Sequence, residues 1–379
     1  MKKKHIISLA LAGSVLASAA IVPGLFRPSA DEDTVAPYVP TITVNISDGQ
    51  EIELLEGNIL EFTKKYVRNK SNSYTLGIDQ FAPKAITLDW EANEGALYYT
   101  LSIATNKEFK DAARYVTFDS EMTFNDLFSA KHYYYQIDAK YEDKTIRSRI
   151  FDFYTADLTR TISIENVSNT RDAGGMKTAD GKRIRQGMIY RTAYFDEITE
   201  KGIQEAREKY RIKTDLDLRK AGEGLTGVSK LGDDIRYYQY SFPYYRGTDG
   251  IDNEENWENV ASAMRVFADE TNYPIAFHCS LGRDRTGMVA MLLQGLLGAS
   301  KTDMLRDYET SRLSYRGSGK DAATTSNLND SYLQTYSYLA NQYDGMTFAE
   351  DCALYLLDVG LTQAEIDSIR NILLEEVDA

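Results

Sequence analysis

The sequence has few of the residues that build metal sites and disulfide frameworks. Its 379 residues include two cysteines and three histidines, of which His5 lies at the extreme N-terminus. His132 and His278 alone are too few for a multi-histidine zinc site, and two cysteines cannot form a disulfide framework. We therefore expect a protein without such a metal site that is stabilised by the packing of its core.

Positive charge is also scarce. The chain has 43 Lys and Arg against 57 Asp and Glu, and its first 30 residues hold four of the basic residues and no acidic one. The chain after residue 30 is therefore strongly acidic, and a protein of this charge is a poor candidate for binding nucleic acid or a general anionic membrane surface. The hydrophobic fraction of 43% excludes global disorder, and the length predicts two or three domains.

Residues 1–30 have the pattern of a secretory signal peptide. Three lysines precede an apolar run at 6–22, and Ala17-Ser18-Ala19 offers an A-x-A cleavage site. Because residues 6–26 carry no charge, an uncleaved N-terminal anchor is the alternative. No cysteine follows the apolar run, which argues against a lipoprotein. We expect the protein to be secreted or held at the cell surface.

Residues 31–157 predict a linker and then an all-β sandwich. Short runs that alternate apolar and polar residues, with turn residues between them, are typical of antiparallel sheets. Trp90 and the tyrosine-rich run at 133–137 resemble the core of a fibronectin type III or immunoglobulin-like module, which could bind a cell-surface or host protein. The runs are residues 41–46, 85–90, 97–105, 133–141 and 149–154.

Residues 158–379 predict an α/β domain, with a central sheet flanked by helices. Strand-like runs alternate with amphipathic segments, the order typical of this class. We expect strands at 184–190, 212–218, 234–242 and 274–278, and helices at 199–210, 256–271, 288–297, 302–313, 330–342, 348–359 and 363–375.

The chemistry of the chain is concentrated where the strand at 274–278 meets the helix that follows. Backbone N–H groups in a turn at a helix N-terminus converge on a tetrahedral oxyanion such as phosphate. The same positive field lowers the pKa of a thiol, so Cys279 is a candidate nucleophile. We expect the phosphate to be bound by Ser280, Leu281, Gly282, Arg283, Asp284 and Arg285.

Individual residues of this turn have distinct expected roles. The planar fork of Arg285 can hold two phosphoryl oxygens and tighten in the transition state. Gly282 lets the loop turn without a Cβ clash. The Thr286 hydroxyl can donate a hydrogen bond to the Cys279 sulfur when the intermediate is hydrolysed and the sulfur leaves. The second cysteine, Cys352, lies in an apolar segment and is expected to be a small buried hydrophobe.

The sequence His278-Cys279-Ser280-Leu281-Gly282-Arg283-Asp284-Arg285-Thr286-Gly287 resembles the H-C-x-x-G-[KR]-D-R-T-G signature of bacterial protein tyrosine phosphatases, within the cysteine-dependent tyrosine and dual-specificity superfamily. Residues 169–175, 180–182, 187–192 and 217–223 are similar to further blocks of that family. The resemblance covers about 160–375. It implies a phosphatase fold and a cysteinyl-phosphate intermediate without metal or other cofactor, with protein phosphotyrosine as the default substrate.

Two pairs in these blocks have alternative interpretations. Arg171 and Asp172 are expected to form a structural turn, although direct contact with substrate is a second possibility. Arg219 and Glu223 are expected to form an ion pair.

The general acid is open between two aspartates. Relatives often place an aspartate directly after a Phe-Pro pair, but here Phe242-Pro243 is followed by Tyr244. Asp284 belongs to the signature. Asp249 lies five residues beyond Tyr244 on the same loop, and it is the acid that a mobile lid could bring to the site. We favour Asp284 slightly.

Three alternatives to a protein-tyrosine phosphatase follow from the same residues. The extra charge of Arg283 would suit a phosphoinositide or inositol phosphate. The missing aspartate after Pro243 would suit a catalytically weak phosphate-binding or adhesive surface protein. Sulfur transfer of the rhodanese kind is disfavoured, because it uses a loop one residue shorter.

Overall fold

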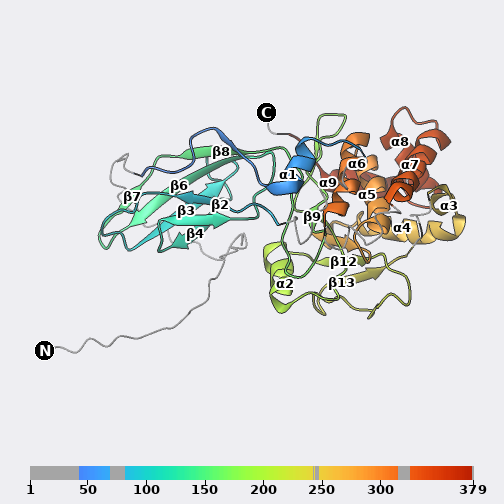
Figure 1. Ribbon diagram of the computed structural model, residues 1–379, viewed down its shortest axis with the longest axis horizontal. Helices are drawn as coiled ribbons and strands as arrows, with labels where there is room; N and C mark the ends of the chain where they lie inside the picture. The colour runs from blue at the N-terminus through green and yellow to red at the C-terminus, as the bar shows by residue number, and fades with distance from the viewer. Residues whose placement is uncertain (1–41, 69–81, 242, 244–246, 315–324, 378–379) are drawn as a thin grey trace.

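The computed structural model describes residues 42–68, 82–241, 243, 247–314 and 325–377. The expected signal peptide, as well as Phe242 and Tyr244, lies outside these residues. Figure 1 shows a β-rich part that holds the strands up to residue 155 and an α/β part that holds the strands and most helices from residue 171 on. Among the described residues, no helix is long and apolar enough to cross a membrane.

The N-terminal part is built from two sheets. The larger runs in the order β1-β8-β6-β3-β4, with β7 also paired to β6, and the smaller joins β2 to β5. Pairing is antiparallel except between β1 and β8. The strands are β1 (Gln50–Ile52), β2 (Ile86–Asp89), β3 (Tyr98–Ala104), β4 (Ala113–Thr117), β5 (Glu121–Phe124), β6 (His132–Lys140), β7 (Thr145–Arg147) and β8 (Phe151–Thr155).

Alternation of side chains explains the core of this part. Tyr133, Tyr135 and Ile137 on β6 point inward, because successive side chains of a strand face opposite sides. They share one buried cluster with Trp90, whose ring lies 5.3 Å from that of Tyr99. Four of the five expected strands are confirmed. The run at 41–46 is the exception, since its described residues contribute only an isolated bridge between Val44 and Trp90.

The C-terminal part is centred on a five-stranded sheet in the order β13-β12-β14-β11-β9. Neighbouring strands are parallel except β9, which is antiparallel to β11 at the edge. The strands are β9 (Arg171–Asp172), β11 (Ile189–Thr192), β12 (Thr214–Asp217), β13 (Arg236–Gln239) and β14 (Ile275–His278), and a separate pair joins β10 (Arg183–Ile184) to β15 (Leu374–Glu375).

Helices cover both faces of this sheet, as expected for an α/β domain. On β14, Ile275 and Phe277 face the larger cluster, while Ala276 faces a smaller cluster around Tyr210. The α-helices are α2 (Glu200–Gln204), α3 (Thr248–Ile251), α4 (Trp257–Val266), α5 (Asp284–Leu296), α6 (Lys301–Thr310), α7 (Thr325–Gln342), α8 (Phe348–Asp358) and α9 (Gln363–Leu373). Shorter turns are η2 (Glu205–Lys209), η4 (Glu254–Asn256), η5 (Glu270–Asn272) and η6 (Ser311–Leu313).

Some expected boundaries differ from the structure. The strand expected at 184–190 is divided into β10 and β11, because Gly187 adopts a φ of 78° that interrupts extended backbone. The helix expected at 199–210 continues from α2 into the π-helical turn η2. Helix α5 begins at Asp284, four residues before the apolar run at 288–297 that predicted it.

The two parts of the chain meet through buried polar contacts and a short helix. Arg160 donates to the carbonyl oxygens of Asp126 and Leu127, and Gln186 exchanges hydrogen bonds with the backbone of Ser129. Helix α1 (Gly57–Lys64), which the sequence reading did not predict, packs against α6 of the α/β part (Figure 1).

Candidate active site

The loop from Cys279 to Arg283, here called the cradle, connects the carboxyl end of β14 to the first residue of α5. The first N–H groups of a helix have no partner within the helix, so those at the start of α5 can bind groups outside it, as the Thr286 N–H binds Cys279. Helix α5 is buried almost throughout, which is why its sequence is apolar on all sides. The cradle is therefore fixed between a buried strand and a buried helix.

The carbonyl groups of the cradle are held by side chains from the sequence block at 169–192. Asn169 Nδ2 donates to the Leu281 carbonyl at 2.9 Å, and Arg191 Nη2 donates to the Gly282 carbonyl at 2.9 Å. In a planar trans peptide, the carbonyl and the following N–H point in opposite directions. The N–H groups that follow the Leu281 and Gly282 carbonyls therefore point to the side of the cradle away from Asn169 and Arg191. On that side an oxyanion can accept hydrogen bonds from them.

Gly282 is required by its surroundings. Its φ is 67°, and a Cβ atom there would lie 2.2 Å from the Thr192 carbonyl oxygen at the end of β11. Both the left-handed backbone and the close approach exclude a larger side chain.

Arg285 is oriented by a carboxylate. Its two Nη atoms donate to the two oxygens of Glu223 at 2.7 and 3.2 Å, and Nη1 also donates to the Leu218 carbonyl. The expected ion pair between Arg219 and Glu223 is therefore wrong: Arg219 pairs with Asp217 and Asp196, and contacts Glu223 only through its carbonyl oxygen. Glu223 instead fixes the fork of Arg285.

The two cysteines are both buried but have opposite pKa shifts. Burial acts to raise the pKa of Cys279, but the Arg285 guanidinium and hydrogen bonds from the side chain and backbone of Thr286 bring it below the ordinary value. Among the described residues the buried Thr286 hydroxyl has no hydrogen-bond partner by distance and angle, so its effect on the pKa of Cys279 rests on its closeness to the sulfur. For Cys352, burial dominates and raises the pKa. Cys279 is thus the cysteine that forms a thiolate more readily.

His278, the residue directly before Cys279, is paired with a carboxylate. It is buried at the end of β14, and its Nε2 lies 2.8 Å from Asp215 Oδ1. Burial acts to lower the pKa of His278, but Asp215 and Asp217 raise it above the ordinary value. The imidazole is thereby biased toward its charged form directly before Cys279.

Asp284 is a partly exposed carboxyl group at the first turn of α5. Arg283 Nε donates to Asp284 Oδ1 at 3.0 Å, and the Tyr308 hydroxyl donates to the same oxygen at 3.1 Å. The Arg283 side chain is only 9% exposed. Arg283 is thus directed toward Asp284 rather than extended into solvent beside the cradle.

Asp249 lies in the short helix α3 and is exposed. Helix α3 contacts α7, and within the described part of the chain no hydrogen bond or ion pair connects Asp249 to the cradle. Four of the six residues just before α3, Phe242 and 244–246, are outside the described residues. Of the two candidate acids, the structure places Asp284 next to the cradle.

Arg171 and Asp172 are buried and occupied by protein partners. Arg171 Nε donates to Asp307 Oδ1 at 2.6 Å, and Asp172 accepts from Arg160 at 2.9 Å and from the backbone of Gly174. Their exposures of 0% and 2% leave no surface for substrate. Both residues are therefore structural rather than in contact with substrate, but the expected turn is wrong, because they form the edge strand β9 paired with β11.

Sequence reasoning did not assign roles to several residues that shape the site. Arg191 pairs with Asp307. Burial acts to raise the pKa of Asp307, but Arg171 and Arg191 lower it to about 2. Asn169 and Arg191 belong to blocks that the family resemblance had marked, which was a usable signal. Asp307 and Tyr308 lie in an ordinary amphipathic helix and gave none.

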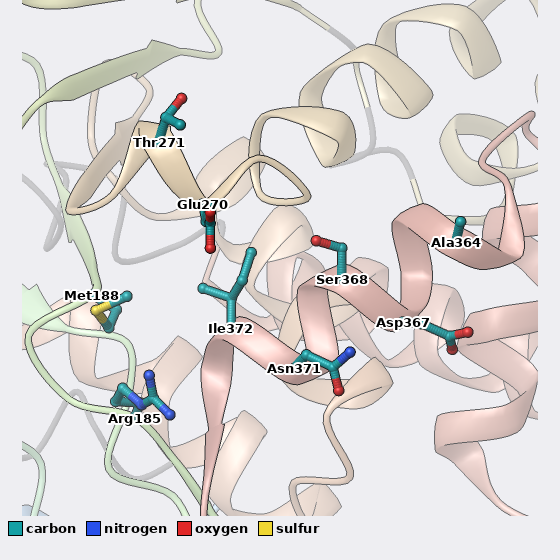
Figure 2. Close-up of a pocket in the computed structure, with 9 residues that line it drawn as sticks. All are labelled: Arg185, Met188, Glu270, Thr271, Ala364, Asp367, Ser368, Asn371 and Ile372. Carbon is teal, nitrogen blue, oxygen red and sulfur yellow. The ribbon is translucent and has the colours of Figure 1, made fainter.

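A cavity of about 890 Å³ lies at the opposite edge of the sheet (Figure 2). Arg185 and Met188 line one side of it, and α9 residues such as Ser368 and Asn371 line the other. Met188 directly precedes β11, whereas the cradle follows the carboxyl end of β14. The cavity therefore is not the site of the cysteine chemistry. Within the described ranges, no three His, Cys, Asp or Glu side chains form a group that could hold a metal ion.

Comparison with solved structures gives weak likeness. The core catalytic domain of the PP-IP phosphatase Siw14 from S. cerevisiae, in complex with citrate, matches 42% of this chain and 91% of that chain. Its sequence identity is 17% and its TM-score 0.28. This likeness is too low to support a statement about activity.

Comparison with other sequences is more specific. A Cupriavidus necator protein that carries a tyrosine-protein phosphatase name is 26% identical over 175 residues, 39% of this chain and 61% of that protein. A tyrosine-protein phosphatase from Nostoc commune is 28% identical over 130 residues, 29% of this chain and 44% of that protein. The chain therefore spans less than two thirds of either relative. The family model described as the tyrosine phosphatase family matches residues 162–375, more than half of the chain. The chain, whose cradle lies within that range, belongs to the tyrosine phosphatase family.

Proposed function

We propose that this protein is a cysteine-dependent phosphatase that hydrolyses phosphomonoesters, with protein phosphotyrosine as its main substrate. The observation that carries the proposal is the arrangement around Cys279. Asn169 and Arg191 hold the cradle carbonyls, Glu223 orients Arg285, and the pKa of the buried thiol is nevertheless lowered. Donors fixed in advance around a nucleophile stabilise charge that develops on a transferring phosphoryl group.

The proposed reaction has two steps. In the first, the Cys279 thiolate attacks phosphorus, the bond to the leaving oxygen breaks, and the carboxyl proton of Asp284 passes to that oxygen. In the second, water attacks the thiophosphoryl group while Asp284 takes a proton from it. The sulfur–phosphorus bond breaks, the thiolate accepts a hydrogen bond from Thr286, and inorganic phosphate leaves.

The structure bears differently on the alternative substrates. An inositol phosphate would be favoured by a free cation beside the cradle, but the Arg283 side chain is nearly buried and paired with Asp284. A catalytically weak phosphate-binding protein was suggested by the missing aspartate after Pro243. Asp284 offers a carboxyl group at the start of α5. In the proposed mechanism it takes the place of the aspartate that is missing after Pro243.

A hydrolysis panel tests the proposal. Wild-type protein and the Cys279→Ser variant are compared on a phosphotyrosine peptide, a phosphoserine peptide, a phosphoinositide and phytate. We expect wild-type turnover to be highest on phosphotyrosine and Cys279→Ser to lose it, because a serine hydroxyl has no comparable ionised fraction. Turnover confined to phytate or phosphoinositide would overturn the substrate class, and full activity of Cys279→Ser would overturn the mechanism.

We also propose that the protein is exported and that its N-terminal β part is a fibronectin type III-like module that binds a cell-surface or host protein. Support comes from the signal-like residues 1–30 and from the two sheets that share a core around Trp90. N-terminal sequencing of protein recovered outside the cell tests export. A chain that stays inside the cell with Met1 intact would contradict it.

A further inference from the structure

The N-terminal part of the chain contributes a helix to the support of the cradle. Residues Leu55, Ile59 and Phe62, at and before α1, form a closed cluster with Leu313 of η6. Ile59 and Phe62 are completely buried, although α1 belongs to a segment between β1 and β2. Helix α1 is therefore docked on the turn that ends α6.

Tyr66, just after α1, reaches a buried carboxylate. Its hydroxyl donates to Glu309 Oε1 at 3.2 Å, and its ring packs edge-on against Phe62 at 5.4 Å. Glu309 is completely buried on α6. A buried carboxylate needs donors around it, so the phenol of Tyr66 helps to fix where this turn of α6 lies.

The same turn of α6 holds the cradle through its other side chains. Asp307 pairs with Arg191, which donates to the Gly282 carbonyl. Tyr308 donates to Asp284, and its ring lies so close to Gly287 that a Cβ there would be 2.6 Å away. Three consecutive residues, 307 to 309, thus connect the cradle, the candidate acid and α1.

The 3₁₀ turn η6, directly after α6, also connects α1 to the residues around the cradle. Leu313 packs in the α1 cluster, while the Ser311 hydroxyl accepts from both Arg171 and Arg191. The short segment η6 is therefore held on one side by hydrophobic contact with α1. On its other side it accepts hydrogen bonds from Arg171 and Arg191.

We infer that Tyr66 and helix α1 are positioning elements for catalysis: they fix α6 and η6, and through Asp307, Arg191 and Tyr308 they fix the cradle and Asp284. The kinetic part of this inference rests on the proposed phosphatase function. It assigns the N-terminal part a role inside the enzyme, in addition to any partner that its β-sheets bind.

The test is made in the full-length protein with Tyr66→Phe, which removes one hydroxyl and keeps the ring. We expect kcat on a phosphotyrosine peptide to fall about 3- to 10-fold with KM nearly unchanged, the range of coupling through packed networks. The control is Tyr99→Phe, which also removes one phenol hydroxyl that makes a hydrogen bond. Tyr99 is buried in the β core, and its hydroxyl accepts from the Asn93 backbone N–H. Tyr99→Phe should leave kcat unchanged.

A double-mutant cycle decides whether Tyr66 acts through Glu309. If it does, Tyr66→Phe combined with Glu309→Gln loses no more activity than the more damaging single variant, because coupled residues are not additive. Multiplied losses, or a Tyr66→Phe kcat equal to wild type, would overturn the inference. Ile59→Val, which trims α1 by one methyl group, is expected to lower kcat in the same direction should Tyr66→Phe fold poorly.

A readout without turnover separates this inference from the proposed function. The rate of iodoacetamide alkylation at Cys279, followed on its own peptide by mass spectrometry, reports the cradle directly. We expect this rate to fall in Tyr66→Phe and not in Tyr99→Phe, even if the wild-type protein hydrolyses none of the substrates tested. Equal rates in all three proteins would overturn the positioning role, whatever the protein hydrolyses.

Discussion

Cys279 is the residue at which burial and local charge act against each other. Burial acts to raise its pKa, as it does for Cys352, but Arg285 and Thr286 bring the pKa of Cys279 below the ordinary value. Because the thiolate is the reactive form, a lowered pKa increases reactivity at neutral pH, and that reactivity is lost as the pH falls through the lowered pKa.

We therefore expect Cys279 to be alkylated readily at pH 7 and Cys352 to remain unmodified in the folded protein. The measurement is the rate of iodoacetamide labelling of each cysteine against pH, by peptide mass spectrometry. Arg285→Gln should move the Cys279 profile to higher pH, because it removes the charge that favours the thiolate. Similar slow labelling of both cysteines would show that the cradle does not activate the thiol.

The two candidate acids differ in position, and this difference predicts their effects. Asp284 lies at the start of α5 beside the cradle, whereas Asp249 is exposed on α3. We expect Asp284→Asn to lose roughly 10²-fold on phosphotyrosine and less on an activated aryl phosphate, whose phenol leaves without protonation. Asp249→Asn should be nearly silent on both.

Steady-state kinetics on the two substrates check this assignment. A larger loss for Asp249→Asn would transfer the acid role to the loop before α3. Equal losses on both substrates for Asp284→Asn would show that it holds Arg283 or the cradle in shape, which its contact with Arg283 makes a real alternative.

At the residue scale, the sequence was sufficient to select Cys279, Arg285 and Thr286 as candidates, because their spacing is tied to a strand-to-helix turn. It was not sufficient to assign partners. Glu223 lies four residues from Arg219 but pairs with Arg285, 62 residues away. Which cation a carboxylate faces depends on how the loop after β12 folds, and local spacing does not encode that.

At the scale of elements, the cradle depends on a close approach between two loops. A Cβ on Gly282 would lie 2.2 Å from the Thr192 carbonyl oxygen at the end of β11, and the φ of Gly282 is positive. Gly181 also has a positive φ but open space around its Cα. Comparing alanine substitutions at Gly282 and Gly181 therefore distinguishes the cost of backbone strain from the cost of a steric clash.

We expect Gly282→Ala to destabilise the protein by about 2–5 kcal/mol, the sum of left-handed strain and overpacking, and to abolish turnover. Gly181→Ala should cost only about 1–2 kcal/mol and keep activity. Chemical denaturation and kinetics on both variants provide the measurement. An active, stable Gly282→Ala variant would mean that the cradle is looser than the structure describes.

Most strands and helices near the site could be predicted from periodicity, but α1 was not. Leu55, Ile59 and Phe62 have the i, i+4, i+7 spacing of a helix face, which was available in the sequence. The helix is only eight residues long and lies between β-patterned runs, so its stability comes from packing on Leu313 rather than from its own propensity.

At the scale of the whole molecule, the two parts of the chain share buried surface. Arg160 connects the backbone of Asp126 and Leu127 to Asp172, and α1 covers Leu313. The expectation from sequence that 158–379 forms the catalytic domain did not include these contacts, because partners so distant along the chain are not visible in a local pattern.

We expect a chain of residues 158–379 to be less stable than one of residues 42–379, and less active on a small aryl phosphate. It exposes Leu313 and removes the Tyr66 hydroxyl from Glu309. Thermal unfolding and kcat of the two chains are the measurements, with circular dichroism as a check on folding. Equal unfolding temperatures and equal kcat would show that the α/β part is independent of the N-terminal part.

The most direct test of the central claim is to trap the covalent intermediate. Wild-type protein is mixed with excess phosphotyrosine peptide, denatured within the first turnovers, digested and analysed by mass spectrometry. We expect one phosphoryl group on the peptide that contains Cys279, and none on that peptide in Cys279→Ser. A phosphoryl group on any other residue, or steady turnover with no modified Cys279 at any quench time, would contradict it.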